Sequence, residues 1–120
     1  MYAVVKIGDK DVPMRAMASI DLYYRNIFHE DPIKLQTRPD FDDAARISFA
    51  MRMGFVMAKF AELPDRKAMN ALNEDAFLDW MDQFERGECL EALVDITMVY
   101  EGQFGTDADA KKKDAEPSAS

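Results

Sequence analysis

The segment from residue 40 to residue 63 constrains the fold most, because it is apolar on nearly every side when wound as a helix. Acidic residues mark its start and Pro64 follows its end. At about 100° per residue, the apolar side chains between Ile47 and Ala61 cover most of the circumference. The polar stripe that remains is narrow and consists of Ser48, Arg52, Lys59 and Glu62. A helix of this kind is normally wrapped by the rest of its domain, so we predict that it is the central helix.

The N-terminus has the pattern of a β-hairpin. Tyr2 to Ile7 is rich in β-branched and aromatic residues, and Gly8 to Asp11 is a turn-forming sequence. Val12 to Ala16 is the predicted returning strand, in which Pro13 has no N–H to donate and should face an unpaired edge. Because a two-stranded hairpin is marginally stable alone, we expect it to pack on helices or on another copy of itself.

Three further helices are predicted around the central one. The first runs from a Ser19 cap to about His29. Another begins at an Asn73 cap and ends near Gly87, and the last runs from Glu88 to about Gly102. The side chains expected to be buried are Phe77, Trp80, Met81 and Phe84 in the first of these two, and Leu90, Leu93, Val94, Thr97 and Met98 in the second.

Together these segments predict an α+β fold that is mainly α. An N-terminal β-hairpin would be followed by a four-helix body in a single domain over residues 1–104. Residues 105–120 lack apolar periodicity, so we predict a disordered polar C-terminal tail there.

Composition excludes several function classes. A net charge of −8 argues against nucleic acid as a partner, because phosphate binding needs clustered Lys and Arg. No apolar run is long enough to span a membrane, and the N-terminus does not resemble a signal peptide. A single cysteine excludes an internal disulfide and fits a reducing compartment, so we expect a cytoplasmic protein.

The residues that could carry chemistry do not form a catalytic set. His29 lies beside Glu30 and Asp31, but a zinc site needs three or four well-placed ligands. Cys89 has acidic neighbours, which would raise its pKa. The carboxylates of Asp75, Asp79 and Asp82 should form a solvated helix face. We therefore predict no enzyme activity, no cofactor and no metal.

Two surfaces are candidates for protein contacts. Phe55 lies in the polar stripe of the central helix, where it could anchor a partner while Arg52 and Lys59 form the rim. The alternative is that the connector at residues 33–39 covers Phe55. The edge of the hairpin is the second candidate, through Tyr2, Val4 and Pro13, and would give a homo-oligomer.

Five motifs in this order resemble the tail assembly chaperones of long-tailed bacteriophages and prophages. They are Lys6-Ile7-Gly8 with the hairpin and Val12-Pro13-Met14-Arg15-Ala16, then Tyr24-Arg25-Asn26-Ile27-Phe28 with Asp31, Phe55-Val56-Met57-Ala58 and Phe77-Leu78-Asp79-Trp80-Met81. The likeness covers about residues 2 to 100. It implies a protein that binds and solubilises the tape measure protein, helps recruit tail tube subunits and is absent from the finished virion. No binding residue carries over from it.

A second interpretation belongs to a different class. The acidic chain could be a regulatory adaptor or an antitoxin-like protein that masks a basic partner. Salt separates the two interpretations, because charge masking weakens with screening and apolar contacts do not. Nine methionines could give a client surface adaptability, although Met also serves as core filler.

Overall fold

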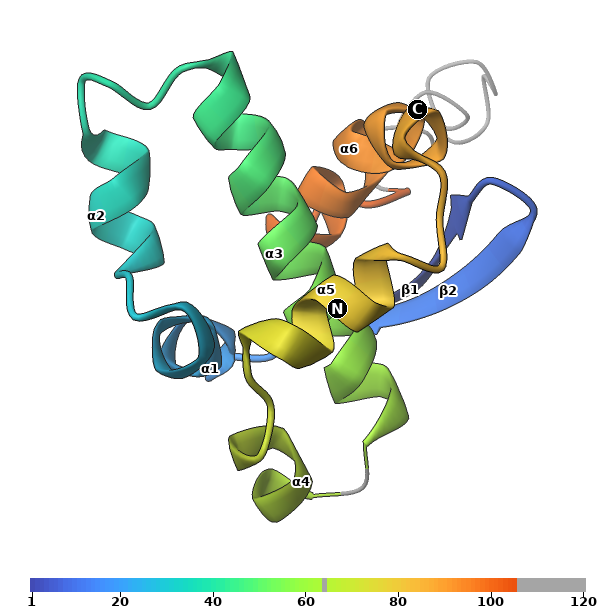
Figure 1. Cartoon of the computed structure of the whole chain (residues 1–120), viewed down its shortest axis with the longest axis horizontal. Coiled ribbons are helices and arrows are strands. Elements are labelled where there is room, and N and C mark those ends of the chain that lie inside the picture. The colour runs from blue at the N-terminus through green and yellow to red at the C-terminus, as the bar shows by residue number, and fades with distance from the viewer. Residues whose placement is uncertain (64, 106–120) are drawn as a thin grey trace, which may run out of the picture.

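The structure is a computed structural model that describes residues 1–63 and 65–105, as a hairpin followed by a helical body (Figure 1). Its elements are β1 (Tyr2–Ile7), β2 (Lys10–Arg15), α1 (Ile20–Phe28), α2 (Pro32–Thr37), α3 (Asp43–Glu62), α4 (Arg66–Asn70), α5 (Glu74–Met81) and α6 (Arg86–Tyr100). The predicted fold class, an α+β arrangement that is mainly α, is confirmed. Residues 106–120, most of the predicted tail, lie outside the described residues.

The described residues contain six helices where the sequence predicted four. The two additional helices, α2 and α4, are short and each follows an aspartate cap. The carboxylate of Asp31 accepts hydrogen bonds from the backbone N–H groups of Ile33 and Lys34, at 2.9 and 3.2 Å. Asp65 accepts one from Ala68, at 2.9 Å. Segments this short show no full apolar period, so capping residues are the signal that could have revealed them.

The hairpin is tighter than predicted, because only Gly8 and Asp9 form its turn and β2 begins at Lys10. Gly8 has a φ of 64°, which glycine adopts without strain. Side chains of β1 alternate between exposed and buried. Val5 pairs with Val12 on the buried face, and Val4 pairs with Pro13 on the outer face.

Helix α3 is central, as predicted, and contacts β2, α6, α1 and α5 (Figure 1). Its middle, from Phe49 to Ala58, is buried on almost every side. Gly54 allows α6 to approach closely, since a Cβ atom there would lie 3.1 Å from Cγ2 of Ile96. The methionines serve this core, because five of them are buried: Met14, Met51, Met53, Met57 and Met69. The structure therefore favours Met as core filler.

The prediction for the last helix was wrong in its start and its buried face. Gly87 does not end α5 but lies inside α6, whose preceding Glu85 N–H donates to the carboxylate of Glu88 at 2.9 Å. The buried residues of α6 are Cys89, Ala92, Ile96 and Val99, whereas Val94 is 69% exposed. Apolar residues lie on several sides of α6, and its small residues let it approach the hairpin and α3 closely. Choosing the larger apolar residues as the buried ones therefore gave the wrong face of α6.

Candidate functional site

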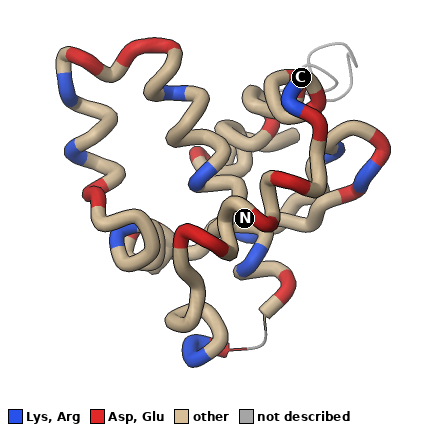
Figure 2. The backbone as a smooth tube through the Cα atoms, viewed as in Figure 1, with Lys and Arg blue, Asp and Glu red and all other residues tan. Residues whose placement is uncertain are grey.

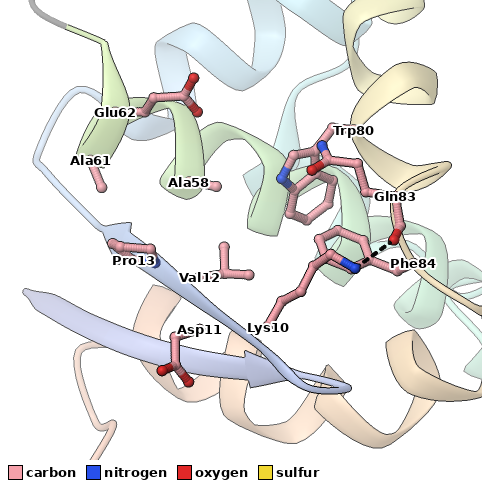
Figure 3. Close-up of a pocket in the computed structure, with 10 residues that line it drawn as sticks. All are labelled: Lys10, Asp11, Val12, Pro13, Ala58, Ala61, Glu62, Trp80, Gln83 and Phe84. Carbon is pink, nitrogen blue, oxygen red and sulfur yellow. Dashed lines mark hydrogen bonds between the residues drawn. The ribbon is translucent and has the colours of Figure 1, made fainter.

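A groove of about 530 Å³ opens between β2, the C-terminal part of α3 and the turn after α5 (Figure 3). We call it the hairpin groove. Its lining residues are Lys10, Asp11, Val12, Pro13, Ala58, Ala61, Glu62, Trp80, Gln83 and Phe84. Three segments that are distant in the sequence thus meet at one surface.

The inner wall of the hairpin groove is apolar and held in place by aromatic packing. Trp80 is 5% exposed, and its ring lies 5.8 Å from that of Phe55 and 5.2 Å from that of Phe84. Ala58 and Ala61 are three residues apart, so they share one face of α3. Their small side chains leave space above the helix, and this space is large enough to accept apolar side chains of another segment.

The rim of the hairpin groove is charged. The ammonium of Lys10 donates to the backbone carbonyl of Gln83 at 3.2 Å and lies 5.8 Å from the centre of the Phe84 ring. This contact ties the hairpin to the turn after α5 (Figure 3). On the opposite side, Glu62 accepts a hydrogen bond from Lys59 at 3.2 Å. An apolar wall with a polar rim is the usual composition of a protein-binding surface.

Phe55 is not a surface contact, contrary to the sequence-based prediction. It is completely buried, with its ring 6.4 Å from that of Phe28 and 5.6 Å from that of Phe77. These rings come from α1 and α5, whereas the alternative interpretation had assigned the cover to residues 33–39. A helical wheel places Phe55 in the polar stripe correctly, but it carries no information about which neighbouring helix covers that stripe.

The two cations of the stripe are also engaged within the fold. The guanidinium of Arg52 lies 3.4 Å from the carboxylate of Glu30 and 5.2 Å from the centre of the Phe28 ring. The ammonium of Lys59 lies 5.9 Å from the centre of the Phe55 ring. The predicted contact group of Arg52, Phe55 and Lys59 is therefore engaged within the fold: Phe55 and Arg52 contact α1 and its end, and Lys59 contacts residues of α3 itself.

Tyr24 joins Arg52 in contacting Glu30. Its hydroxyl donates to the Glu30 carboxylate at 3.1 Å, and burial raises its pKa to about 12. A hydroxyl with a raised pKa stays protonated at neutral pH and so remains a donor to Glu30. This network joins the end of α1 to α3.

The residues of the predicted self-association edge lie on the exposed outer face of the hairpin. Tyr2 is 55% and Val4 is 45% exposed, and Pro13 is also exposed. Val4 and Pro13 are cross-strand neighbours, and the Arg15 guanidinium lies 5.3 Å from the centre of the Tyr2 ring. These side chains thus form one surface.

The residues considered for metal binding or catalysis have separate structural tasks. Glu30 pairs with Arg52, and Asp31 caps α2, where the N–H of Lys34 lowers the pKa of its carboxyl. His29 ends α1 in the left-handed conformation, with φ 57°. Burial, and then the charge of Glu88, raises the pKa of the Cys89 thiol. Within the described residues no cluster of three potential metal ligands occurs.

Comparison of the chain with models of known protein families, with curated proteins and with solved structures found no match. Among the described helices, none has both the length and the apolar character required to cross a membrane.

Proposed function

We propose that this protein is a tail assembly chaperone of a long-tailed bacteriophage or prophage, acting in the bacterial host cytoplasm. In this function it binds and solubilises the tape measure protein, helps recruit tail tube subunits and leaves before the virion is complete. The hairpin groove is the proposed client-binding surface.

The observation that carries the proposal is that three motifs behind the family resemblance meet at the hairpin groove. Val12 and Pro13 come from the second motif, Ala58 ends the fourth and Trp80 belongs to the fifth (Figure 3). These motifs are far apart in the chain, and their convergence on one apolar surface supports a shared binding role for them.

The chemistry of the groove suits a helical client. An amphipathic helix binds by inserting apolar side chains, spaced three and four residues apart, into a hydrophobic groove. The wall formed by Ala58, Ala61 and Trp80 offers such a surface, and contacts at the polar rim would exclude water from it once a client is bound. Since five methionines lie in the core, the groove itself and not a methionine-rich surface would supply the client contact.

The test is to fill the groove without changing the fold. Ala61→Trp places a large side chain in the groove, and Ala44→Trp is the matched control in the exposed first turn of the same helix. Each variant is coexpressed with the tape measure protein, and the soluble fraction of that client is measured. We expect Ala61→Trp to lower this fraction severalfold and Ala44→Trp to leave it unchanged. Equal protection by both variants would contradict the assignment of the groove.

An acidic adaptor or antitoxin-like protein is the second candidate, and the outer face of α5 favours it. Asp75 and Asp79 of α5 and Asp82 at its C-cap are exposed, as predicted, and Figure 2 shows further acidic positions in the chain after α5. A salt titration of client binding separates the two functions. Binding through the hairpin groove should persist at 0.5 M salt, whereas masking of a basic partner should weaken steeply, because the screening length falls to a few ångströms.

A further inference from the structure

The two outer edges of the hairpin differ in their capacity for hydrogen bonds. Met1 and Ala16 exchange both backbone bonds, at 2.7 and 2.8 Å. In an antiparallel pair, hydrogen-bonded and non-hydrogen-bonded positions alternate. From this register, the N–H and C=O groups of Tyr2, Val4 and Lys6 point away from β2. Those of their partners on β2 point away from β1.

The outer edge of β2 is protected. Pro13 lies at the centre of this edge and has no N–H, so the edge lacks a donor where an added strand would need one. Helix α3 packs against β2 and helix α6 against β1, so helix packing does not distinguish the two edges. Proline on an edge strand is one way in which proteins prevent edge-to-edge pairing.

The outer edge of β1 contains no proline. Tyr2, Val4 and Lys6 keep every donor and acceptor, and no hydrogen bond joins these outward groups to another residue within the described part of the chain. The two strands have similar lengths, so the difference is one of chemistry. Of the two edges, only that of β1 keeps every backbone donor and acceptor that an added strand would bond.

We propose that the β1 edge pairs with β1 of a second copy, antiparallel and centred on Val4. In this register Val4 lies opposite Val4 of the second copy, and Tyr2 lies opposite Lys6 of the second copy. All three outward positions become hydrogen-bonded pairs, with about six backbone bonds in total. The result is a four-stranded sheet whose two buried faces lie on the same side.

The side chains on the outer face of the hairpin support a second copy of this chain as the partner of the β1 edge. One row of side chains then crosses all four strands of the new sheet. It contains Arg15 and Tyr2 of one copy, followed by Lys6 and Asp11 of the second copy. The ring of Tyr2, which already contacts Arg15, gains a second cation, and Lys6 keeps its cross-strand neighbour Asp11. This complementarity is local and opposes the general repulsion between two chains of charge −8.

The centre of the outer face is apolar in the same register. Val4 and Pro13 of one copy lie beside Val4 and Pro13 of the other, so two exposed pairs become one continuous strip. This arrangement accounts for an exposed valine at the middle of a strand. It also refines the sequence-based prediction, because Tyr2 and Val4 belong to the pairing edge, while Pro13 belongs to the opposite edge and contributes only its side chain.

The first experiment removes the central donor. Val4→Pro deletes an N–H that β1 does not use within its own hairpin, as the proline already present at the partner position shows. Light scattering after gel filtration should give a dimer for the parent and for Val4→Thr, and a monomer for Val4→Pro. A C-terminal tag is required, because the N-terminal amino group bonds to Ala16. A monomeric parent, or a folded Val4→Pro variant that still dimerises, would overturn the proposal.

The second experiment tests the register and remains decisive if Val4→Pro fails to fold. Cα atoms of a hydrogen-bonded antiparallel pair lie about 5.5 Å apart, which a disulfide can bridge. Val4→Cys should therefore oxidise to a covalent dimer, whereas Tyr2→Cys and Lys6→Cys should crosslink only when mixed with each other. Val94→Cys, at a position 69% exposed, is the control. Crosslinking of Val94→Cys as fast as that of Val4→Cys would contradict the proposal. Both experiments use this protein alone, so neither depends on the identity of the client.

Discussion

The carboxylate of Glu88, at the start of α6, occupies the space in which a Cβ atom on Gly8 would lie. The same carboxylate accepts the N–H of Glu85 at 2.9 Å and thereby caps α6. The hairpin turn and the start of α6 are thus fitted to each other through one glycine. A Cβ atom on Gly8 would therefore force the end of the Glu88 side chain to move away from its capping position.

We expect Gly8→Ala to destabilise the fold by about 2–3 kcal/mol. A residue with a Cβ atom in the left-handed conformation costs about 1–2 kcal/mol, and displacing the Glu88 cap adds about 1 kcal/mol. Chemical denaturation measures the sum. Gly102→Ala is the control, since it has a similar φ of 73° and nothing within 4 Å, so it should show the conformational cost alone. Equal costs for both variants would mean that the contact with Glu88 is unimportant.

The main elements of this fold could be predicted from the sequence because their apolar patterns extend over the whole of each segment. The strand from Tyr2 to Ile7 and the central helix up to Glu62 were both recognised from their apolar patterns. The two shortest helices were missed, since five or six residues do not complete two helical turns. Their aspartate caps were present in the sequence, but aspartate before a short polar segment is equally common in loops.

The candidate site was less predictable, because it depends on contacts between elements. Phe55 lies among polar residues along its own helix, and only the positions of α1 and α5 reveal that it is buried. The hairpin groove likewise exists only where β2 meets Ala58 and Trp80. By contrast, the exposure of Tyr2 and Val4 follows from strand alternation alone, which is a local property and therefore visible in the sequence.

Phe55→Ser should now reduce stability and not oligomer size. A polar hydroxyl in place of a completely buried ring creates a cavity and an unsatisfied group, at a cost of about 3–5 kcal/mol. Urea denaturation should show the loss directly. Val94→Ser is the comparison, because that side chain is 69% exposed and should change stability by less than about 0.5 kcal/mol. A stable Phe55→Ser variant of altered oligomeric mass would restore the contact interpretation.

Trp80→Ala should cost about 3–5 kcal/mol, because it removes a large buried ring that packs on Phe55 and Phe84. It should also open the inner wall of the hairpin groove, so client protection and stability should fall together. Trp80→Phe separates the two effects by keeping an aromatic wall. We expect Trp80→Phe to recover most of the stability measured by urea denaturation. A cost below about 1 kcal/mol for Trp80→Ala would show that α5 is not packed as described.

Stability should decrease at high pH because of two tyrosines. Burial raises the pKa of Tyr24 and of Tyr100 to about 12, and Tyr100 also donates to the Asp21 carboxylate at 2.8 Å. An unfolded tyrosine loses its proton near its ordinary pKa of 10.0, so between this value and about 12 the unfolded state binds fewer protons. Stability is therefore complete below pH 10 and falls as the pH rises toward 12.

Denaturant midpoints measured from pH 8 to pH 11.5 should show this decrease in the parent. The double variant Tyr24→Phe and Tyr100→Phe removes both ionising hydroxyls, so its stability should fall less steeply over the same range, although it starts lower at pH 8 through the loss of two hydrogen bonds. Parallel curves for parent and double variant would show that neither buried hydroxyl controls the loss, and the alkaline transition would then have to be assigned to other groups.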